Sequence, residues 1–249
     1  MKNIHFKRFL LTVIPFSLLG AAFKVMTLVE GLTEIRPVNA IPIIAGLLFG
    51  PVGALGCAAG NLIADCFGTL SRVSWLGMLI NFMAAYLPWR LWYMVKQEKP
   101  NVHTWPNIFF FTWLSLLSAQ TVAWMLSFGM EVCFDQWMKT MYVYVFTNNF
   151  AFSLGLALPI FIVLTSDSVQ LLPADPPGKI IKSHRQTRIF TAIAAAYTVT
   201  MALIMAGVFS GYHLKNSLTM LLCSLLSLVL LIFLCFAPVK PQPGTSPSR

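Results

Sequence analysis

RPVNAIPIIAGLLFGPVGALGCAAGNLIAD, the sequence of residues 36–65, contains two apolar runs joined by a Gly-Pro turn at Gly50 and Pro51. We place the first run at 38–50 and the second at 52–70, and Pro37 and Pro42 interrupt the start of the first. Because a proline removes a backbone hydrogen bond, the first run predicts a short, broken or tilted helix. Such interruptions are tolerated in a membrane only where protein or a cavity shields the freed backbone groups.

Small residues recur four positions apart in both runs. The rows are Gly46-x-x-x-Gly50 and Gly56-x-x-x-Gly60-x-x-x-Ala64. On a helix each row lies along one face, where the missing side chains let another backbone approach closely. Two interpretations stay open: tight packing within the chain, or a surface on which a partner protein docks.

The rest of the chain is also apolar. Of its 249 residues, 57% are hydrophobic and 10% are charged, whereas soluble domains carry about 25% charged residues. Eight apolar runs follow one another, at 9–29, 38–50, 52–70, 74–95, 107–130, 140–165, 188–210 and 217–237. The predicted fold class is therefore an all-α integral membrane protein of about eight spans, with the bilayer covering its apolar surface. The apolar run at 9–29 is too long for a cleaved signal peptide and predicts a retained helix.

The distribution of Lys and Arg predicts the orientation. With the N-terminus inside and alternating spans, they divide twelve to four between the two sides, and Lys24 lies within the first span. The inner residues are Lys2, Lys7, Arg8, Arg90, Lys96, Lys99, Lys179, Lys182, Arg185, Arg188, Lys240 and Arg249. The outer residues are Arg36, Arg72, Lys139 and Lys215. Because cytoplasmic loops are enriched in Lys and Arg, we expect a multi-pass cell-membrane protein with both termini in the cytoplasm. The net charge of +9 then reflects contact with anionic headgroups of the lipid bilayer, and no nucleic-acid partner is predicted.

A long polar stretch divides the chain. Residues 166–187 contain three prolines and basic residues, and we interpret them as a cytoplasmic linker. It separates a six-span membrane core, 1–165, from a C-terminal two-span hairpin, 188–237. The Pro- and Ser-rich tail, 238–249, is predicted to be disordered.

Polar side chains within the spans point to a site. Ionisable and amide side chains are costly in a span and usually face the bundle interior or a wet cavity. Asn61 and Asp65 are four residues apart, so they share one face of the third span. The topology places polar residues of five of the first six spans, or their flanking loops, at one depth near the outer side. These candidate substrate-binding residues are Glu34, Arg36, Asn39, Asn61, Asp65, Asn81, Gln120, Asn148 and Asn149. A wet pocket open to the outside explains them together, and the alternative is a set of separate interhelical hydrogen bonds, each worth about 0.6 kcal/mol.

The segment 36–65 resembles a known family. Its Pro-bearing first run, the turn at Gly50 and the glycine-rich run ending in Asp65 are similar to the substrate-binding membrane subunits (S components) of energy-coupling-factor (ECF) transporters. By the number of spans, the similarity extends to 1–165. It implies a six-helix core that captures a vitamin-like or similar small solute from outside. A transmembrane coupling protein and ATPase subunits on other chains would then drive uptake.

The chain departs from that family in two places. It has two additional C-terminal spans. Its first span also lacks a clear Ala-x-x-x-Ala row, which in the family contacts the coupling protein; Ser17 and Ala21 are the nearest match.

Other functions have less support in the sequence. The chain contains no His-Glu-x-x-His, Gly-x-Ser-x-Gly or P-loop sequence, its four histidines are dispersed, and its five cysteines form no Cys-x-x-Cys pair. We therefore predict no enzymatic activity, catalytic residue, metal ligand or cofactor. A membrane sensory or scaffold module that acts through a separate cytoplasmic partner stays open as the alternative to solute uptake.

Overall fold

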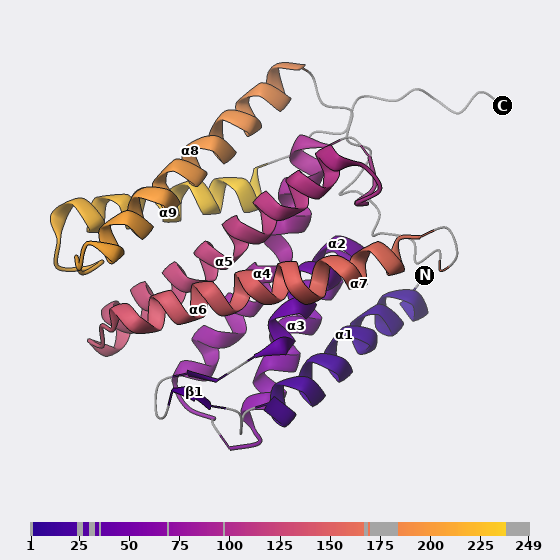
Figure 1. Cartoon of the computed structure of the whole chain (residues 1–249), viewed down its shortest axis with the longest axis horizontal. Coiled ribbons are helices and arrows are strands. Elements are labelled where there is room, and N and C mark those ends of the chain that lie inside the picture. Colours follow the sequence, from indigo (N-terminus) through magenta and orange to yellow (C-terminus); the bar gives the residue numbers. More distant parts are fainter. Residues whose placement is uncertain are drawn as a thin grey trace.

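The computed structural model describes residues 2–23, 27–29, 33–34, 36–68, 70–96, 98–166, 169 and 184–237. Within these ranges the protein is helical apart from two short antiparallel strands, β1 (Thr27–Val29) and β2 (Thr33–Glu34). The α-helices are α1 (Lys2–Ala22), α2 (Ile41–Phe49), α3 (Pro51–Asp65), α4 (Val73–Val95), α5 (Trp105–Phe134), α6 (Lys139–Phe152), α7 (Leu158–Leu164), α8 (His184–Phe209) and α9 (Leu218–Phe236). A 3-10 helix, η2 (Pro37–Ala40), leads into α2, and a π-helix, η3 (Ser153–Ala157), joins α6 to α7 (Figure 1).

Several of these helices have the length and composition of membrane spans. In the described residues, five segments are long and apolar enough to cross a bilayer: Ile4–Ala22, Trp105–Phe134, Lys139–Leu164, Gln186–Phe209 and Leu218–Phe236. The chain is thus a predominantly helical, membrane-embedded protein, as its composition predicts. Each of the eight predicted apolar runs overlaps a helix, and α6, η3 and α7 together occupy the sixth.

The first part of the chain departs from the predicted boundaries. The prediction that the first helix continues to residue 29 is wrong, because α1 ends at Ala22 and β1 begins at Thr27. Thr27 and Val29 are β-branched residues, which favour strands. The helices α2 and α3 contain 9 and 15 residues, so they are about 14 and 22 Å long and neither alone matches a hydrocarbon core of about 30 Å. Gly50 between them has a φ of 60°, a conformation that a residue with a Cβ rarely adopts.

The glycine rows are covered by neighbouring helices of the same chain. A Cβ atom on Gly56 would lie 2.6 Å from Cβ of Thr12, and one on Gly60 would lie 2.8 Å from Cβ of Phe16, both in α1. A Cβ on Gly46 would lie 1.9 Å from the carbonyl oxygen of Ala85 in α4. These contacts confirm tight packing within the chain as the role of Gly46, Gly56 and Gly60.

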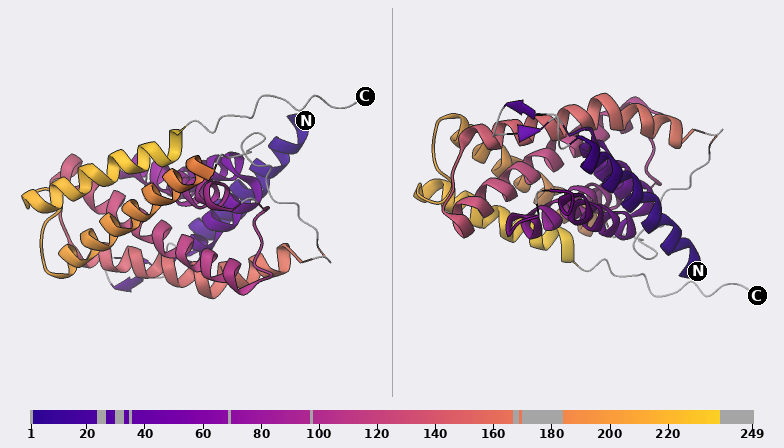
Figure 2. Two further views of the ribbon diagram at one scale, coloured as in Figure 1. Left: turned by 90° about the horizontal axis from the view of Figure 1, so that it is seen from above. Right: turned by 90° about the horizontal axis from the view of Figure 1, so that it is seen from below.

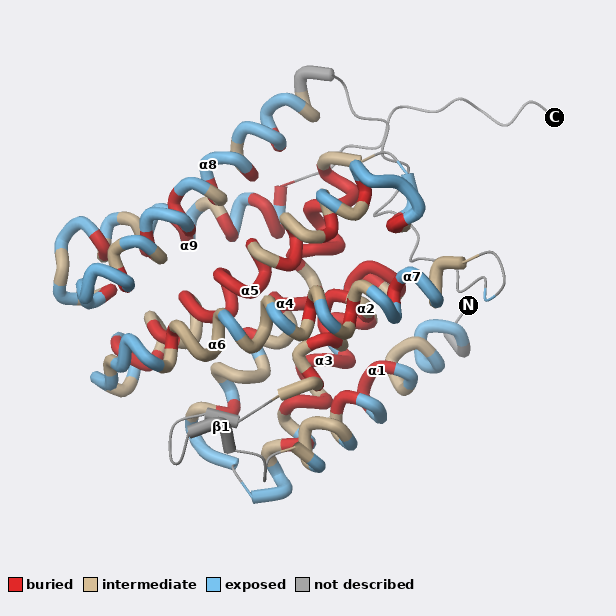
Figure 3. The backbone as a smooth tube through the Cα atoms, viewed as in Figure 1, coloured by how far each residue is buried: buried red, intermediate tan, exposed pale blue. Residues whose placement is uncertain are grey.

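The centre of the molecule is formed by α4 and α5. Trp92 of α4 and both Phe111 and Trp124 of α5 are completely buried. Figure 3 shows the buried backbone concentrated in α2, α3, α4 and α5, while α1, α8 and α9 present exposed faces. The helices α1 and α8–α9 therefore lie at the periphery, as the two views in Figure 2 also show. Their exposed aliphatic side chains suit contact with lipid.

The C-terminal hairpin α8–α9 is fastened to the core. Arg90 of α4 donates hydrogen bonds to the carbonyl oxygens of Leu234, at 3.1 Å, and Ala237. The Tyr86 hydroxyl donates to the carbonyl oxygen of Cys235 at 3.2 Å. Orphan carbonyls at the end of α9 thus find donors in α4. Most of the predicted linker 166–187 and all of the predicted tail 238–249 lie outside the described residues.

Candidate functional site

The polar residues at the end of α3 form a hydrogen-bonded network with α4. Asn81 of α4 donates from Nδ2 to Oδ1 of Asn61 at 3.1 Å. Asn61 in turn donates from Nδ2 to Oδ2 of Asp65 at 3.4 Å. Asn61 is only 6% exposed, whereas Asp65 and Asn81 are half-buried. The prediction that Asn61 and Asp65 share a helix face is therefore confirmed.

A glycine in α4 makes room for this network. A Cβ on Gly77 would lie 2.9 Å from Nδ2 of Asn61, so a larger residue would push the amide away. The carbonyl oxygen of Gly77 also accepts a hydrogen bond from Nδ2 of Asn81 at 2.9 Å. The amide of Asn61 has one donor and one acceptor engaged along the network, which fixes its orientation. The residue thus holds Asp65 and Asn81 in register across two helices.

A second polar contact joins the segment after β2 to α6. The backbone N–H of Arg36 donates to Oδ1 of Asn148 at 3.5 Å. Asn39, in η2, is half-buried, and its side-chain amide makes no hydrogen bond within the part of the chain that the structure describes. The side chain of Glu34 and all of Lys24 lie outside the described residues.

Two predicted site residues point elsewhere. Gln120 of α5 is buried, and its Nε2 lies 3.0 Å from Sδ of Met205 in α8. Ser118 of α5 donates to the carbonyl oxygen of Ala84 in α4, so Gln120 lies near the depth of Asn81, but its amide faces α8 rather than α3. Asn149 donates from Nδ2 to the carbonyl oxygen of Val145 in its own helix, at 2.8 Å. The structure thus brings together Asn61, Asp65 and Asn81, and separately Arg36 with Asn148.

The combination of groups sets the chemistry that is available. A carboxylate beside amides can accept hydrogen bonds and balance a positive charge, but it offers no nucleophile activated by a base. Among the described residues, no group of three or more His, Cys, Asp or Glu side chains could hold a metal ion. The arrangement can therefore accept hydrogen bonds from a polar solute and balance a positive charge on it.

Sequence reasoning missed a buried carboxylate at the end of α5. Glu131 is 2% exposed, and its Oε2 accepts hydrogen bonds from the backbone N–H groups of Leu214 and Lys215, both at 3.0 Å. Its Oε1 lies 3.3 Å from Nδ1 of His213, and the His213 ring lies tilted against the Trp137 ring, with the centroids 5.4 Å apart. Glu131 thus fastens the α8–α9 loop to α5. The available signal was an acid one residue beyond the apolar run 107–130.

Comparisons with models of known protein families, with curated proteins and with solved structures find no match.

Proposed function

We propose that this chain is a membrane subunit that binds a small vitamin-like or metabolite solute from the outer side of the cell membrane for ECF-type uptake. The observation that carries the proposal is the chain of hydrogen bonds from Asn81 through Asn61 to Asp65. Polar groups at membrane depth are expensive and are most often associated with substrate or ion pathways. Here they are held in a defined geometry in a helix pair.

The roles within this site follow from the hydrogen bonds. Asn61 is a positioning residue, because its amide is engaged on both sides by Asn81 and Asp65. Asp65 is the solute contact, since it is half-buried and carries the acceptor charge. The amide of Asn39 supplies a further donor and acceptor. One carboxylate with amides favours a solute that is cationic or that carries heterocyclic N–H groups.

The set of proposed contacts is smaller than the sequence predicts. It comprises two groups: Asn61, Asp65 and Asn81 of α3 and α4, and Arg36 and Asn148 together with the half-buried Asn39. Gln120 and Asn149 are left out, because their amides face Met205 and Val145. Glu34 is left out as well, because its side chain lies outside the described residues.

The coupling surface also changes. Ser17, part of the expected contact with a coupling protein, donates to the carbonyl oxygen of Gly60 at 3.4 Å and so faces α3. The outward face of α1 instead carries Leu11, Ile14 and Leu18, which are 59%, 52% and 66% exposed. We propose this aliphatic face as the part of α1 that a transmembrane coupling protein contacts.

Ligand binding by the purified protein tests the proposal. A panel of vitamins and metabolites is titrated into the detergent-solubilised chain, and binding is followed by calorimetry or by mass spectrometry of retained ligand. Asp65→Asn keeps the shape of the side chain but removes its charge, so we expect at least roughly a tenfold loss of affinity, as for a hydrogen bond to a charged group. Asp135→Asn is the matched control, because Asp135 is exposed, has a φ of 53°, and Asn tolerates that conformation.

Equal affinity of Asp65→Asn and the unchanged protein would overturn the assignment of Asp65, and the absence of any bound solute would overturn solute uptake. Identification of co-purifying proteins then distinguishes solute uptake from the sensory or scaffold alternative. An ATPase-containing complex supports uptake, whereas a cytoplasmic signalling enzyme in the complex supports the sensory or scaffold module.

A further inference from the structure

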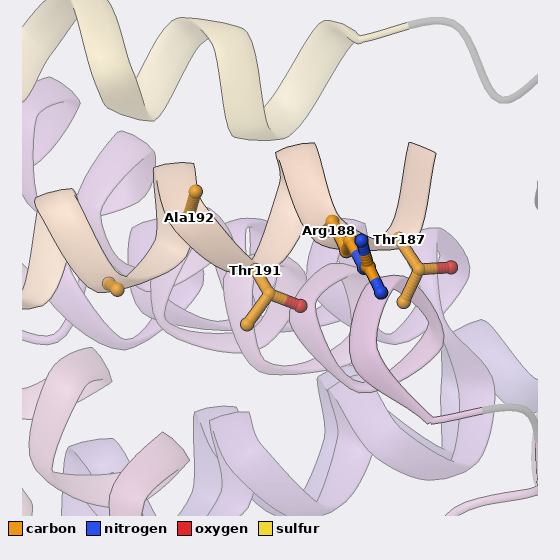
Figure 4. A pocket seen from close by; sticks show the side chains of 5 residues that line it. Thr187, Arg188, Thr191 and Ala192 are labelled. Carbon is orange, nitrogen blue, oxygen red and sulfur yellow. The ribbon is translucent and has the colours of Figure 1, made fainter. Parts of the chain in front are cut away.

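A hollow of about 410 Å³ lies along the first turns of α8, away from the proposed solute site. It is lined by Thr187, Arg188, Thr191, Ala192 and Ala195. Figure 4 shows the side chains of Thr187, Arg188 and Thr191 on the same side of the helix. The alanines follow further along α8, so the hollow has a polar end and an apolar end.

The polar end offers hydrogen-bond donors that nothing else uses. Within the part of the chain that the structure describes, Arg188 has no ion pair or hydrogen bond from its guanidinium, and the Thr187 and Thr191 hydroxyls have no partner. Further along the same helix, the hydroxyls of Thr198 and Thr200 donate to backbone carbonyl oxygens instead. The first turns of α8 therefore present a positive charge and two hydroxyls to a molecule outside the chain.

The depth of the hollow follows from the span to which it belongs. The apolar segment of α8 begins at Gln186 and ends at Phe209, so Arg188 lies at the level of the lipid headgroups whichever way the helix crosses. Ala192 and Ala195 lie one and two turns deeper and are exposed, so the apolar end opens toward the acyl chains. A ligand that matches both ends has an anionic head and an apolar body.

Two other basic residues, Arg90 and Lys96, are occupied by groups of the chain itself. The end of α9 lies beside the start of α8, as the contact between the Phe190 and Phe233 rings shows. Arg90, which reaches the end of α9, is engaged by the carbonyl oxygens there. Lys96, at the end of α4, donates from Nζ to Oδ1 of Asn107 at 2.8 Å. Arg188 is thus available where these two are not.

We propose that this hollow binds the phosphate group of an anionic phospholipid. The guanidinium of Arg188 pairs with two phosphate oxygens, a geometry for which its planar fork is suited. The hydroxyls of Thr187 and Thr191 donate to the remaining oxygens, and an acyl chain lies over Ala192 and Ala195. Basic residues at the ends of membrane helices attract anionic headgroups in the same way. The site is independent of the solute site at Asp65.

Lipid retention measured by native mass spectrometry tests this site. The full-length protein in detergent is titrated with phosphatidylglycerol or with phosphatidylcholine. We expect phosphatidylglycerol to bind tighter, and Arg188→Gln to weaken its binding by roughly tenfold. Arg188→Lys keeps the charge but not the fork, so it recovers only part of the affinity. Thr187→Val with Thr191→Val tests the hydroxyls and should also weaken phosphatidylglycerol binding.

The control is Lys99→Gln, which removes the same charge from an exposed loop residue between α4 and α5. If Lys99→Gln weakens phosphatidylglycerol binding as much as Arg188→Gln does, the lipid is held by non-specific attraction to positive charge. That result would overturn the site. A further arm adds inorganic phosphate. If phosphate alone binds as tightly and displaces phosphatidylglycerol, the hollow recognises a soluble anion and the lipid assignment is wrong. Arg188 is exposed, so its substitution is not expected to disturb folding. Unchanged thermal stability of each variant checks this.

Discussion

The helices α3 and α9 both lie against α4, but they are held there in different ways. On the side of α2 and α3, groups approach closely where a residue has no side chain: the Ala85 carbonyl oxygen of α4 at Gly46 of α2, and the Asn61 amide of α3 at Gly77 of α4. On the α9 side, the long side chains of Arg90 and Tyr86 reach backbone carbonyl oxygens at the end of the helix. The first kind of contact depends on shape and fails when volume is added. The second depends on donors and fails when a polar group is removed.

The largest effect is expected from adding volume on the first side. In Gly46→Val the new Cβ would lie 1.9 Å from the carbonyl oxygen of Ala85, a backbone atom that cannot turn away. We expect the free energy of unfolding to fall by about 3 kcal/mol, at the upper end of overpacking effects. Thermal unfolding of the detergent-solubilised protein measures it. Gly155→Ala is the control, because nothing lies within 4 Å of a Cβ there, and equal stability of the two variants would contradict close packing at Gly46.

The next largest effect is expected from removing Arg90, the donor that holds the end of α9 against α4. Arg90→Met keeps most of the volume but leaves the carbonyl oxygens of Leu234 and Ala237 without this partner. A buried acceptor without its donor costs about 2 kcal/mol. We expect faster hydrogen exchange at the end of α9, measured by mass spectrometry, with little change in α3. Arg72→Met removes an exposed arginine instead and should leave α9 unchanged; equal exchange in both variants would exclude Arg90 as the anchor.

The other end of the hairpin offers a smaller test. Glu131→Ala removes the acceptor of the Leu214 and Lys215 N–H groups, which lie in a loop that water can partly reach. We expect a loss of about 1–2 kcal/mol and faster exchange at these two amides. Glu131→Gln keeps an acceptor oxygen, so its stability should lie between that of Glu131→Ala and that of the unchanged protein. Unchanged exchange in Glu131→Ala would mean that the loop is held by other contacts.

The smallest effect on stability is expected at an exposed ion pair beside the α8–α9 loop. Lys215 pairs with Asp135 at 3.1 Å, and the Asp135 side chain is 90% exposed. Exposed ion pairs contribute little, so Lys215→Gln should change the free energy of unfolding by about 0.5 kcal/mol or less. A shift in thermal stability as large as that of Glu131→Ala would show that charge, rather than the buried acceptor, holds the loop.

The two sides of α4 also differ in how well the sequence predicts them. Spacing alone predicts that Gly56 and Gly60 share a face and that Asn61 lies beside Asp65, because helical periodicity is a local property. Spacing does not say which helix covers the row, and internal packing differs from partner docking only in that α1 of the same chain lies against α3. The anchors of α9 left no local pattern at all, since any backbone carbonyl can accept from Arg90.

The sequence predicts a common depth for the site residues, but it does not predict the direction in which each side chain points. Gln120 lies near the depth of Asn81, yet it faces Met205 of α8, because a residue's depth in a span does not fix its rotation about the helix axis. The sequence did not predict β1 and β2 either, since an apolar run with β-branched residues suits a helix and a strand alike. Asn148, for which the sequence predicts the same depth as Arg36, accepts a hydrogen bond from the Arg36 backbone N–H.

The turn at Gly50 has a consequence for biogenesis. Because α2 and α3 are each too short to hold a transmembrane position alone, the translocon has no autonomous span to release when this pair leaves the ribosome. Their residence in the bilayer depends on α1, made earlier, and on α4, made later, which together enclose the glycine rows. Membrane integration of residues 36–65 is therefore expected to be delayed until α4 has been synthesised.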